Sequence, residues 1–156
     1  MDRMKRIPVR EQAPKVRATN FEEVCLGYNE EEAKAEASRC LNCKNPRCVS
    51  KCPVSISIPD FIAQVKEGNF AEAAKIISKS SALPAVCGRV CPQENQCEGQ
   101  CVLGIKGEAI AIGKLERFVA DWARENKVDL SETAPKNGKK VAVIGSGPAG
   151  IACARD

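Results

Sequence analysis

The stretch of sequence that decides the fold runs from Cys40 to Pro53 and reads CLNCKNPRCVSKCP. A second cysteine-rich stretch runs from Cys87 to Cys101 and reads CGRVCPQENQCEGQC. Each stretch holds four cysteines, and each contains one Cys-Pro step. Thiols spaced this closely in two separate blocks indicate metal binding, and the remaining sequence bears on which metal centre they form.

The first stretch has the spacing of an iron–sulfur site. Two-cluster bacterial ferredoxins use Cys-x₂-Cys-x₂-Cys-x₃-Cys-Pro, in which the fourth cysteine binds the other cluster. The first stretch matches this pattern with two residues added to the middle spacer. A short loop can surround three corners of a cuboidal cluster, so the fourth ligand must come from a distant part of the chain. We therefore predict that Cys40, Cys43 and Cys48 bind one 4Fe–4S cluster. Cys52 is then expected to bind a second cluster together with ligands from the later stretch.

Other kinds of cysteine site fit this chain less well. The 156 residues include 10 cysteines and no histidine, which excludes Cys₂His₂ zinc fingers, Rieske centres, histidine-ligated haem and a histidine general base. Disulfides need an oxidising compartment, and residues 1–10 lack the apolar segment of a secretory signal. Zinc remains the main alternative, although only Cys40 and Cys43 form the Cys-x₂-Cys knuckle that zinc sites use in pairs. Cys25 and Cys153 stand apart and are expected to be small packed residues.

Composition excludes several classes of partner. The net charge is +4, and the lysines and arginines are spread along the chain. A single Trp and a single Tyr provide no series of aromatic platforms for nucleic-acid bases. No apolar run approaches the roughly 20 residues that a membrane span needs. We therefore expect a cytoplasmic protein that binds neither nucleic acid nor membrane, with one modest core.

Helices are predicted before, between and after the cysteine stretches. Asn29 caps a helix that leads to the first stretch, and acidic residues follow it in the first turn. Pro59 and Gly68 mark the start and end of another helix, and Pro84 opens a short helix in the second stretch. The clearest helix covers residues 112–126 and carries an apolar stripe that we expect to be core, made of Ile112, Leu115, Phe118, Val119 and Trp122.

The end of the chain differs in character from the rest. Lys139 to Ile144 reads as a strand rich in Val, and a glycine-rich turn and the start of a helix follow it. This context is that of a dinucleotide-binding turn, in which glycines let the backbone approach a pyrophosphate. A complete βαβ unit needs about 30 residues, so only the start of such a domain is present. The predicted cofactor-binding residues are Gly145, Ser146, Gly147, Pro148, Ala149 and Gly150.

The chain is therefore expected to have four parts. We predict an irregular N-terminal arm over 1–28, an all-α two-cluster domain over 29–127, a polar linker over 128–138, and over 139–156 the truncated start of a Rossmann-type FAD-binding domain. We expect the chain to be a fragment of a longer protein, or to have lost the rest of it, and the last part alone should not hold flavin.

Taken together, these motifs resemble a known family. The resemblance is carried by residues 20–24 (NFEEV), 36–43 (EASRCLNC), 83–92 (LPAVCGRVCP) and 111–121 (AIGKLERFVAD), and by the glycine-rich turn. The sequence is similar to the N-terminal iron–sulfur domain of the small subunit of NADPH-dependent glutamate synthase. It is also similar to the large subunit of ferredoxin:NADP oxidoreductase and to the N-terminal domain of dihydropyrimidine dehydrogenase.

The resemblance implies an α-helical ferredoxin-like domain ahead of nucleotide-binding domains, in an oxidoreductase of glutamate biosynthesis. Electrons would pass from NADPH to FAD and then through two 4Fe–4S clusters. The acceptor would be a flavin in a large glutamate synthase-like subunit, or another flavin or ferredoxin. The fragment alone would have no catalytic residues. The alternatives are the corresponding domain of ferredoxin:NADP oxidoreductase, and a binding module in which the metal only staples the fold.

The resemblance also bears on the eighth ligand. Spacing alone favours Cys87, whereas the resemblance implies Glu116 in the long helix, so one of these two side chains is expected to complete the second cluster. On the resemblance, the first cluster takes Cys40, Cys43, Cys48 and Cys101, and the second takes Cys52, Cys91, Cys97 and Glu116.

Overall fold

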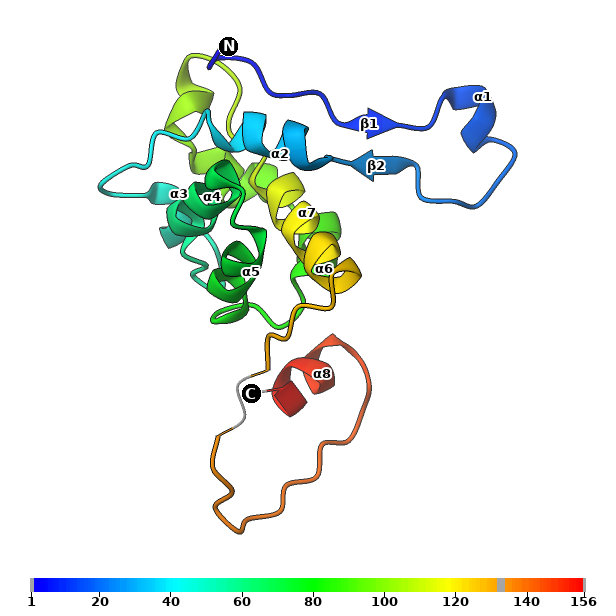
Figure 1. Ribbon diagram of the computed structural model, residues 1–156, viewed down its shortest axis with the longest axis vertical. Helices are drawn as coiled ribbons and strands as arrows, with labels where there is room; N and C mark the ends of the chain where they lie inside the picture. The colour runs from blue at the N-terminus through cyan, green and yellow to red at the C-terminus, as the bar shows by residue number, and fades with distance from the viewer. Residues whose placement is uncertain (1, 132–133, 156) are drawn as a thin grey trace.

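The computed structural model describes residues 2–131 and 134–155, shown in Figure 1. The predicted arm, linker and terminal segment therefore each include residues outside the described part, at 1, at 132–133 and at 156. The α-helices are α1 (Pro14–Arg17), α2 (Glu30–Ala37), α3 (Arg47–Ser50), α4 (Ile58–Glu67), α5 (Phe70–Ser78), α6 (Pro84–Val90), α7 (Ile112–Glu125) and α8 (Pro148–Arg155). The strands are β1 (Arg10–Glu11) and β2 (Cys25–Gly27), and the short 3₁₀ helices are η1 (Gln93–Asn95), η2 (Glu98–Gln100) and η3 (Val102–Ile105).

Helix α2 begins where the sequence predicts. The Asn29 side chain accepts a hydrogen bond from the backbone N–H of Glu32 at 2.8 Å, and the Glu32 carboxylate accepts one from the backbone N–H of Asn29 at 2.8 Å. This reciprocal capping box satisfies two backbone donors that the first turn leaves free. The helix ends at Ala37, so Arg39 and Cys40 leave it in a turn that leads into the first cysteine stretch.

The core lies between α4, α5 and α7. Gly68 ends α4 in the left-handed conformation, with φ 82°, and the chain turns there into α5. Phe61 of α4 and Leu115 of α7 are fully buried. Phe70 of α5 meets Phe118 of α7 edge to face, with ring centroids 5.0 Å apart. The predicted apolar stripe of the long helix is therefore core, as expected.

Helix α6 lies against α7 unusually closely. A Cβ atom at Gly88 of α6 would come 2.7 Å from the backbone nitrogen of Arg117 and 2.8 Å from the carbonyl oxygen of Gly113. Only glycine permits this approach. The close crossing brings the end of the short helix, where Cys91 lies, beside the first half of α7.

The N-terminal arm, predicted to be irregular, contains a small two-stranded sheet. β1 and β2 pair antiparallel because α1 reverses the chain between them, and Gln12 donates its backbone N–H to the Val24 carbonyl at 2.9 Å. These short strands are largely exposed and carry no alternating apolar pattern, so periodicity gave no signal for them. The predicted fold included no strand in the arm and is incomplete at this point, while the elements described within 29–127 are helical. The rest of the body is a helical ferredoxin-like domain beside a small two-stranded sheet.

The C-terminal segment forms only part of what its sequence predicts. Residues 139–147 are extended and exposed and form no strand in the described part of the chain, because no second strand pairs with them. Helix α8 does begin within the glycine turn, at Pro148. Its Arg155 donates a hydrogen bond to the Ser81 carbonyl at 2.7 Å, which brings the helix to the end of α5. Cys153 is exposed on this helix, which corrects the expectation that it is packed.

Among residues 2–131 and 134–155, no helix combines the length and the apolar character that crossing a membrane requires.

Candidate metal centre

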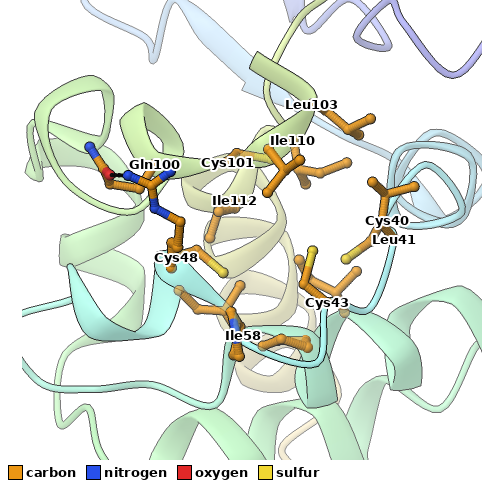
Figure 2. Close-up of a pocket in the computed structure, with 15 residues that line it drawn as sticks. Cys40, Leu41, Cys43, Cys48, Ile58, Gln100, Cys101, Leu103, Ile110 and Ile112 are labelled. Atoms are coloured by element: carbon orange, nitrogen blue, oxygen red, sulfur yellow. Dashed lines mark hydrogen bonds between the residues drawn. The ribbon is translucent and has the colours of Figure 1, made fainter. Parts of the chain in front are cut away.

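The first group of donors converges on one pocket. Figure 2 shows Cys40, Cys43, Cys48 and Cys101 around a space that apolar side chains such as Ile110 border. Cys40 and Cys43 come from the loop after α2, and Cys48 lies in α3. Cys101 lies between η2 and η3, so it belongs to the second cysteine stretch. The chain thus brings three thiols from one stretch and one from the other to the same place.

Backbone N–H groups in the first loop point at the sulfur atoms. Asn42 has a positive φ of 47°, and its backbone N–H donates to the Cys40 sulfur. The backbone N–H of Val49, which donates to the Pro46 carbonyl at 3.0 Å, also lies near enough to the Cys48 sulfur to lower its pKa. Such N–H···S bonds favour a negatively charged thiolate and tune the potential of an iron–sulfur cluster. The loop geometry therefore suits cysteines that act as anionic ligands.

A fully buried ion pair holds the start of this loop. Arg39 and Glu36 are each 0 % exposed, and their side chains meet at 2.5 Å. The Arg39 guanidinium also donates to the backbone carbonyls of Glu108, at 2.5 Å, and Arg3, at 3.1 Å. Because Arg39 directly precedes Cys40, this pair fixes the first thiol of the loop.

Glu36 ties two further segments to the same point. Its carboxylate accepts backbone N–H groups of Ile7 at 2.8 Å and of Ala111 at 2.9 Å. Ile7 belongs to the N-terminal arm, and Ala111 precedes α7. A buried charge is tolerated when it is both paired and hydrogen-bonded, as it is here. The arm, the first cysteine loop and the long helix are therefore held together by one carboxylate.

The second group of donors lies around Cys91. Cys87, Glu116 and Cys52 lie close enough to Cys91 to raise the pKa of its thiol. Cys52 and Glu116 raise the pKa of the Cys97 thiol in the same way. Cys52 belongs to the first stretch, so here too one thiol crosses between the stretches. The first group shows the same separation, because Cys101 raises the pKa values of both Cys40 and Cys48, and Cys43 and Cys40 contribute to them in turn. The cysteine donors thus divide into two groups with interleaved chains.

Glu98 secures the second stretch to the long helix. Its side chain is 8 % exposed and accepts the backbone N–H of Gly113, in the first turn of α7, at 3.0 Å. Arg6 of the arm pairs with the same carboxylate at 2.5 Å. A carboxylate at a helix N-terminus satisfies a free N–H and interacts favourably with the helix dipole. Cys97, one residue earlier, is thereby held beside α7.

Burial raises the pKa values of the thiols in both groups. Desolvation raises the pKa of Cys48 to about 11, that of Cys91 to about 11 and that of Cys97 to about 12. The pKa of Cys40 is also raised, mainly by burial. Without a cation these thiols stay protonated near neutral pH, and an iron centre has to displace their protons to bind.

Glu116 is a buried carboxylate with an orphaned atom. The side chain is 7 % exposed, and its Oε1 atom is buried without a hydrogen-bond partner. Burial alone raises the pKa of Glu116 to about 7. The neighbouring Arg117 pairs instead with Glu23 and Asp121. Leaving a buried acceptor unsatisfied costs about 1–3 kcal/mol, so a cation or a hydrogen-bond donor at this oxygen would stabilise the site. The donor set of the second group therefore fits an iron-containing group.

Zinc is the alternative metal for these donors. Zinc holds its sulfur ligands about 2.3 Å away, so the four sulfurs crowd around one point. Within the described ranges, no three Cys, Asp or Glu side chains approach closely enough to hold one metal ion. The first group instead surrounds a pocket, which is the arrangement that the separate corners of a cuboidal cluster need.

The structure does not bring every predicted site residue together. The six residues of the glycine turn, Gly145 to Gly150, lie mostly exposed in the terminal segment. Cys25 lies half-buried in β2 and lines no part of the first pocket. Sequence reasoning assigned no positioning role to Glu36, Arg39 or Glu98, although Glu36 and Arg39 lie in the motif over 36–43. Their burial distinguishes them from ordinary charged side chains.

Comparison with known proteins gives the family of the chain. Residues 17–128 match the family model described as dihydropyrimidine dehydrogenase domain II, 4Fe–4S cluster. The chain is 46 % identical over 142 residues to the glutamate synthase (NADPH) small chain of Escherichia coli K12, covering 90 % of this chain and 30 % of that protein. It is 44 % identical over 142 residues to the same-named protein of Halomonas elongata, with 90 % and 30 % covered.

A third relative comes from another enzyme. The chain is 40 % identical over 116 residues to the NAD-dependent dihydropyrimidine dehydrogenase subunit PreT of Escherichia coli K12, covering 74 % of this chain and 28 % of that subunit. The chain therefore spans about 30 % of the length of the curated relatives it matches. The matched part holds both cysteine stretches and α7. The chain belongs to the 4Fe–4S domain family of dihydropyrimidine dehydrogenase domain II.

Proposed function

We propose that this domain relays electrons through two neighbouring 4Fe–4S clusters in a glutamate synthase small-subunit-like enzyme. The observation that carries the proposal is the division of the donors into two groups that exchange one cysteine each. Cys101 leaves its own stretch to join the first group, and Cys52 leaves the first stretch to join the second. Shared loops keep the two clusters close together, and short separations are what electron transfer between clusters needs. Each cluster, when bound, accepts and releases one electron.

The proposed ligands follow the two groups. The first cluster is held by Cys40, Cys43, Cys48 and Cys101, and the second by Cys52, Cys91, Cys97 and Glu116. The orphaned Oε1 atom of Glu116 supports this carboxylate as the eighth ligand, because iron would satisfy it. A carboxylate is a harder ligand than a thiolate, so it would set the potential of the second cluster apart from that of the first.

The wider enzyme is proposed from the relatives and from the terminal segment. The glycine turn and α8 would begin an FAD-binding domain over 139–156, and 128–138 would link it to the cluster domain over 29–127. Electrons would enter from NADPH through FAD and leave to a flavin of a large glutamate synthase-like subunit. We place the enzyme in the cytoplasm, because a reducing compartment keeps cluster-binding thiols available.

Anaerobic purification with metal analysis tests the clusters. We expect about eight iron and eight sulfide per chain, and visible absorption that dithionite bleaches reversibly. Cys101→Ser should lose about half of the iron, whereas Cys25→Ser, which alters a thiol outside both groups, should lose none. Two zinc ions in place of iron, or equal iron in Cys101→Ser and the natural protein, would overturn the assignment.

Assays of the full-length enzyme test the acceptor. With its large partner subunit, it should form glutamate from glutamine and 2-oxoglutarate at the expense of NADPH. Reduction of ferredoxin without glutamate formation would reject the glutamate synthase assignment while leaving the cluster relay intact.

A further inference from the structure

The second group contains one donor more than a cluster needs. Four irons of a cuboidal cluster take one ligand each, and Cys52, Cys91, Cys97 and Glu116 already supply four. Cys87 is a fifth donor beside them, one helical turn before Cys91 in α6, where the backbone N–H of Cys91 donates to the Cys87 carbonyl at 3.1 Å. We infer that Cys87 is a reserve ligand, a thiol that replaces Glu116 on the same iron of the second cluster. This inference rests on the proposed function.

The helix geometry places Cys87 beside Cys91. The two residues are four apart, so they lie on one face of α6. The backbone N–H of Cys91 donates to the Cys87 carbonyl at 3.1 Å, which keeps the last turn of the helix intact up to the proposed ligand. The Gln93 side chain donates to the Cys87 carbonyl at 3.3 Å and fixes the same turn from the loop that follows. The position of the thiol is therefore set by the fold.

The close helix crossing brings Glu116 to the same spot. The backbones of Gly88 and Arg117 approach closely, because a Cβ atom on Gly88 would lie 2.7 Å from the backbone nitrogen of Arg117. Cys87 directly precedes Gly88, and Glu116 directly precedes Arg117. Cys87 and Glu116 both lie near the Cys91 thiol, since both raise its pKa. The thiol and the carboxylate are thus alternatives for one corner of the cluster.

Ligand chemistry makes the exchange balanced. Iron in a sulfide cluster binds thiolate well, and a carboxylate is the harder of the two ligands. In the exchange the Fe–O bond to Glu116 breaks and an Fe–S bond to Cys87 forms. The Cys87 thiol gives its proton to the departing carboxylate, so the charge of the site does not change. No oxidant or reductant is needed.

Iron content tests this inference directly. Glu116→Ala should keep about eight iron per chain because Cys87 takes the free corner, and Cys87→Ala should also keep about eight. The double variant Glu116→Ala/Cys87→Ala should fall to about four. Glu116→Ala/Cys25→Ala is the matched control, since Cys25 is another half-buried thiol outside the group, and it should keep about eight.

Thiol labelling supplies a second readout that activity cannot mimic. Iodoacetamide applied anaerobically to the loaded protein, followed by peptide mass mapping, should modify Cys87 in the natural protein. In Glu116→Ala, Cys87 should become protected, while the exposed Cys153 is modified equally in both.

Two results would overturn the inference. If Glu116→Ala loses iron as far as the double variant does, or leaves Cys87 open to modification, Cys87 is no reserve ligand. If Cys87→Ala alone loses a cluster, Cys87 is the resident ligand and the assignment of Glu116 fails with it. A natural protein without iron would instead reject the proposed function itself, and the two failures are thereby told apart.

Discussion

Removing Arg39 should weaken the hold on the first cluster more than removing any exposed arginine. Arg39→Ala takes away the partner of a carboxylate that is 0 % exposed, together with the donors to two backbone carbonyls. Glu36 keeps two backbone N–H donors, from Ile7 and Ala111, so it is not left entirely uncompensated. The loop that begins at Cys40 should then open more readily.

The size of the effect follows from the burial. Breaking a buried ion pair by removing one partner costs about 3–5 kcal/mol. Taking about 4 kcal/mol, and letting half of it appear in the rate of unfolding, gives an increase of about 30-fold. Arg10 is the matched control, because its 3.1 Å pair with Glu32 is exposed, with 48 % of the Arg10 side chain accessible. An exposed pair contributes about 0–1 kcal/mol, so Arg10→Ala should change that rate by about twofold or less.

The assay is the loss of iron–sulfur absorption in guanidinium under anaerobic conditions. The loaded protein loses its colour as it unfolds, and the rate is read from single-exponential traces. We expect Arg39→Ala to bleach about 30 times faster than the natural protein, for the reason given above. If Arg39→Ala and Arg10→Ala bleach within a factor of about two of each other, the buried pair does not secure the site.

Three further predictions address the helix crossing, the arm and the thiols. Gly88→Ala should destabilise the domain by about 1–3 kcal/mol in thermal unfolding, because its new Cβ would meet backbone atoms at 2.7 Å, whereas Gly104→Ala, whose nearest contact is 3.5 Å, should have little effect. Arg89→Ala removes the bridge from α6 to the arm at Glu23, so trypsin should cut within α1 faster than in the natural protein, and an unchanged rate would show that the arm is held elsewhere. In iron-free protein the pKa of Cys48 is raised to about 11, so its thiolate fraction is small at pH 8 and grows as the pH rises. Its modification by iodoacetamide should therefore accelerate about tenfold per pH unit between 8 and 10 and should start well below that of exposed Cys153, and a flat profile would contradict the burial.

Part of the fold and of the site could be read from the chain alone, because the signals are local. Spacing predicted an iron–sulfur site at the first stretch, and capping and apolar periodicity predicted α2 and α7. The resemblance implied Cys101 as the fourth ligand of the first cluster and Glu116 as the eighth ligand. Spacing alone had favoured Cys87 as the eighth ligand. The short sheet in the arm was missed because its strands are exposed and carry no alternation of apolar and polar residues. The strand predicted over 139–144 does not form because no second strand pairs with it.

What the sequence by itself determined is the chemistry of the donors and the length of the helices that carry them, since both depend on residues close together in the chain. The tertiary structure brings Cys101 into one pocket with Cys40, Cys43 and Cys48, a grouping that the resemblance implied and that spacing alone had left open. It also decided that Glu116 is buried with a free oxygen beside Cys91. The physical reason is the crossing of α6 and α7 at Gly88, a contact between distant segments that no local pattern encodes.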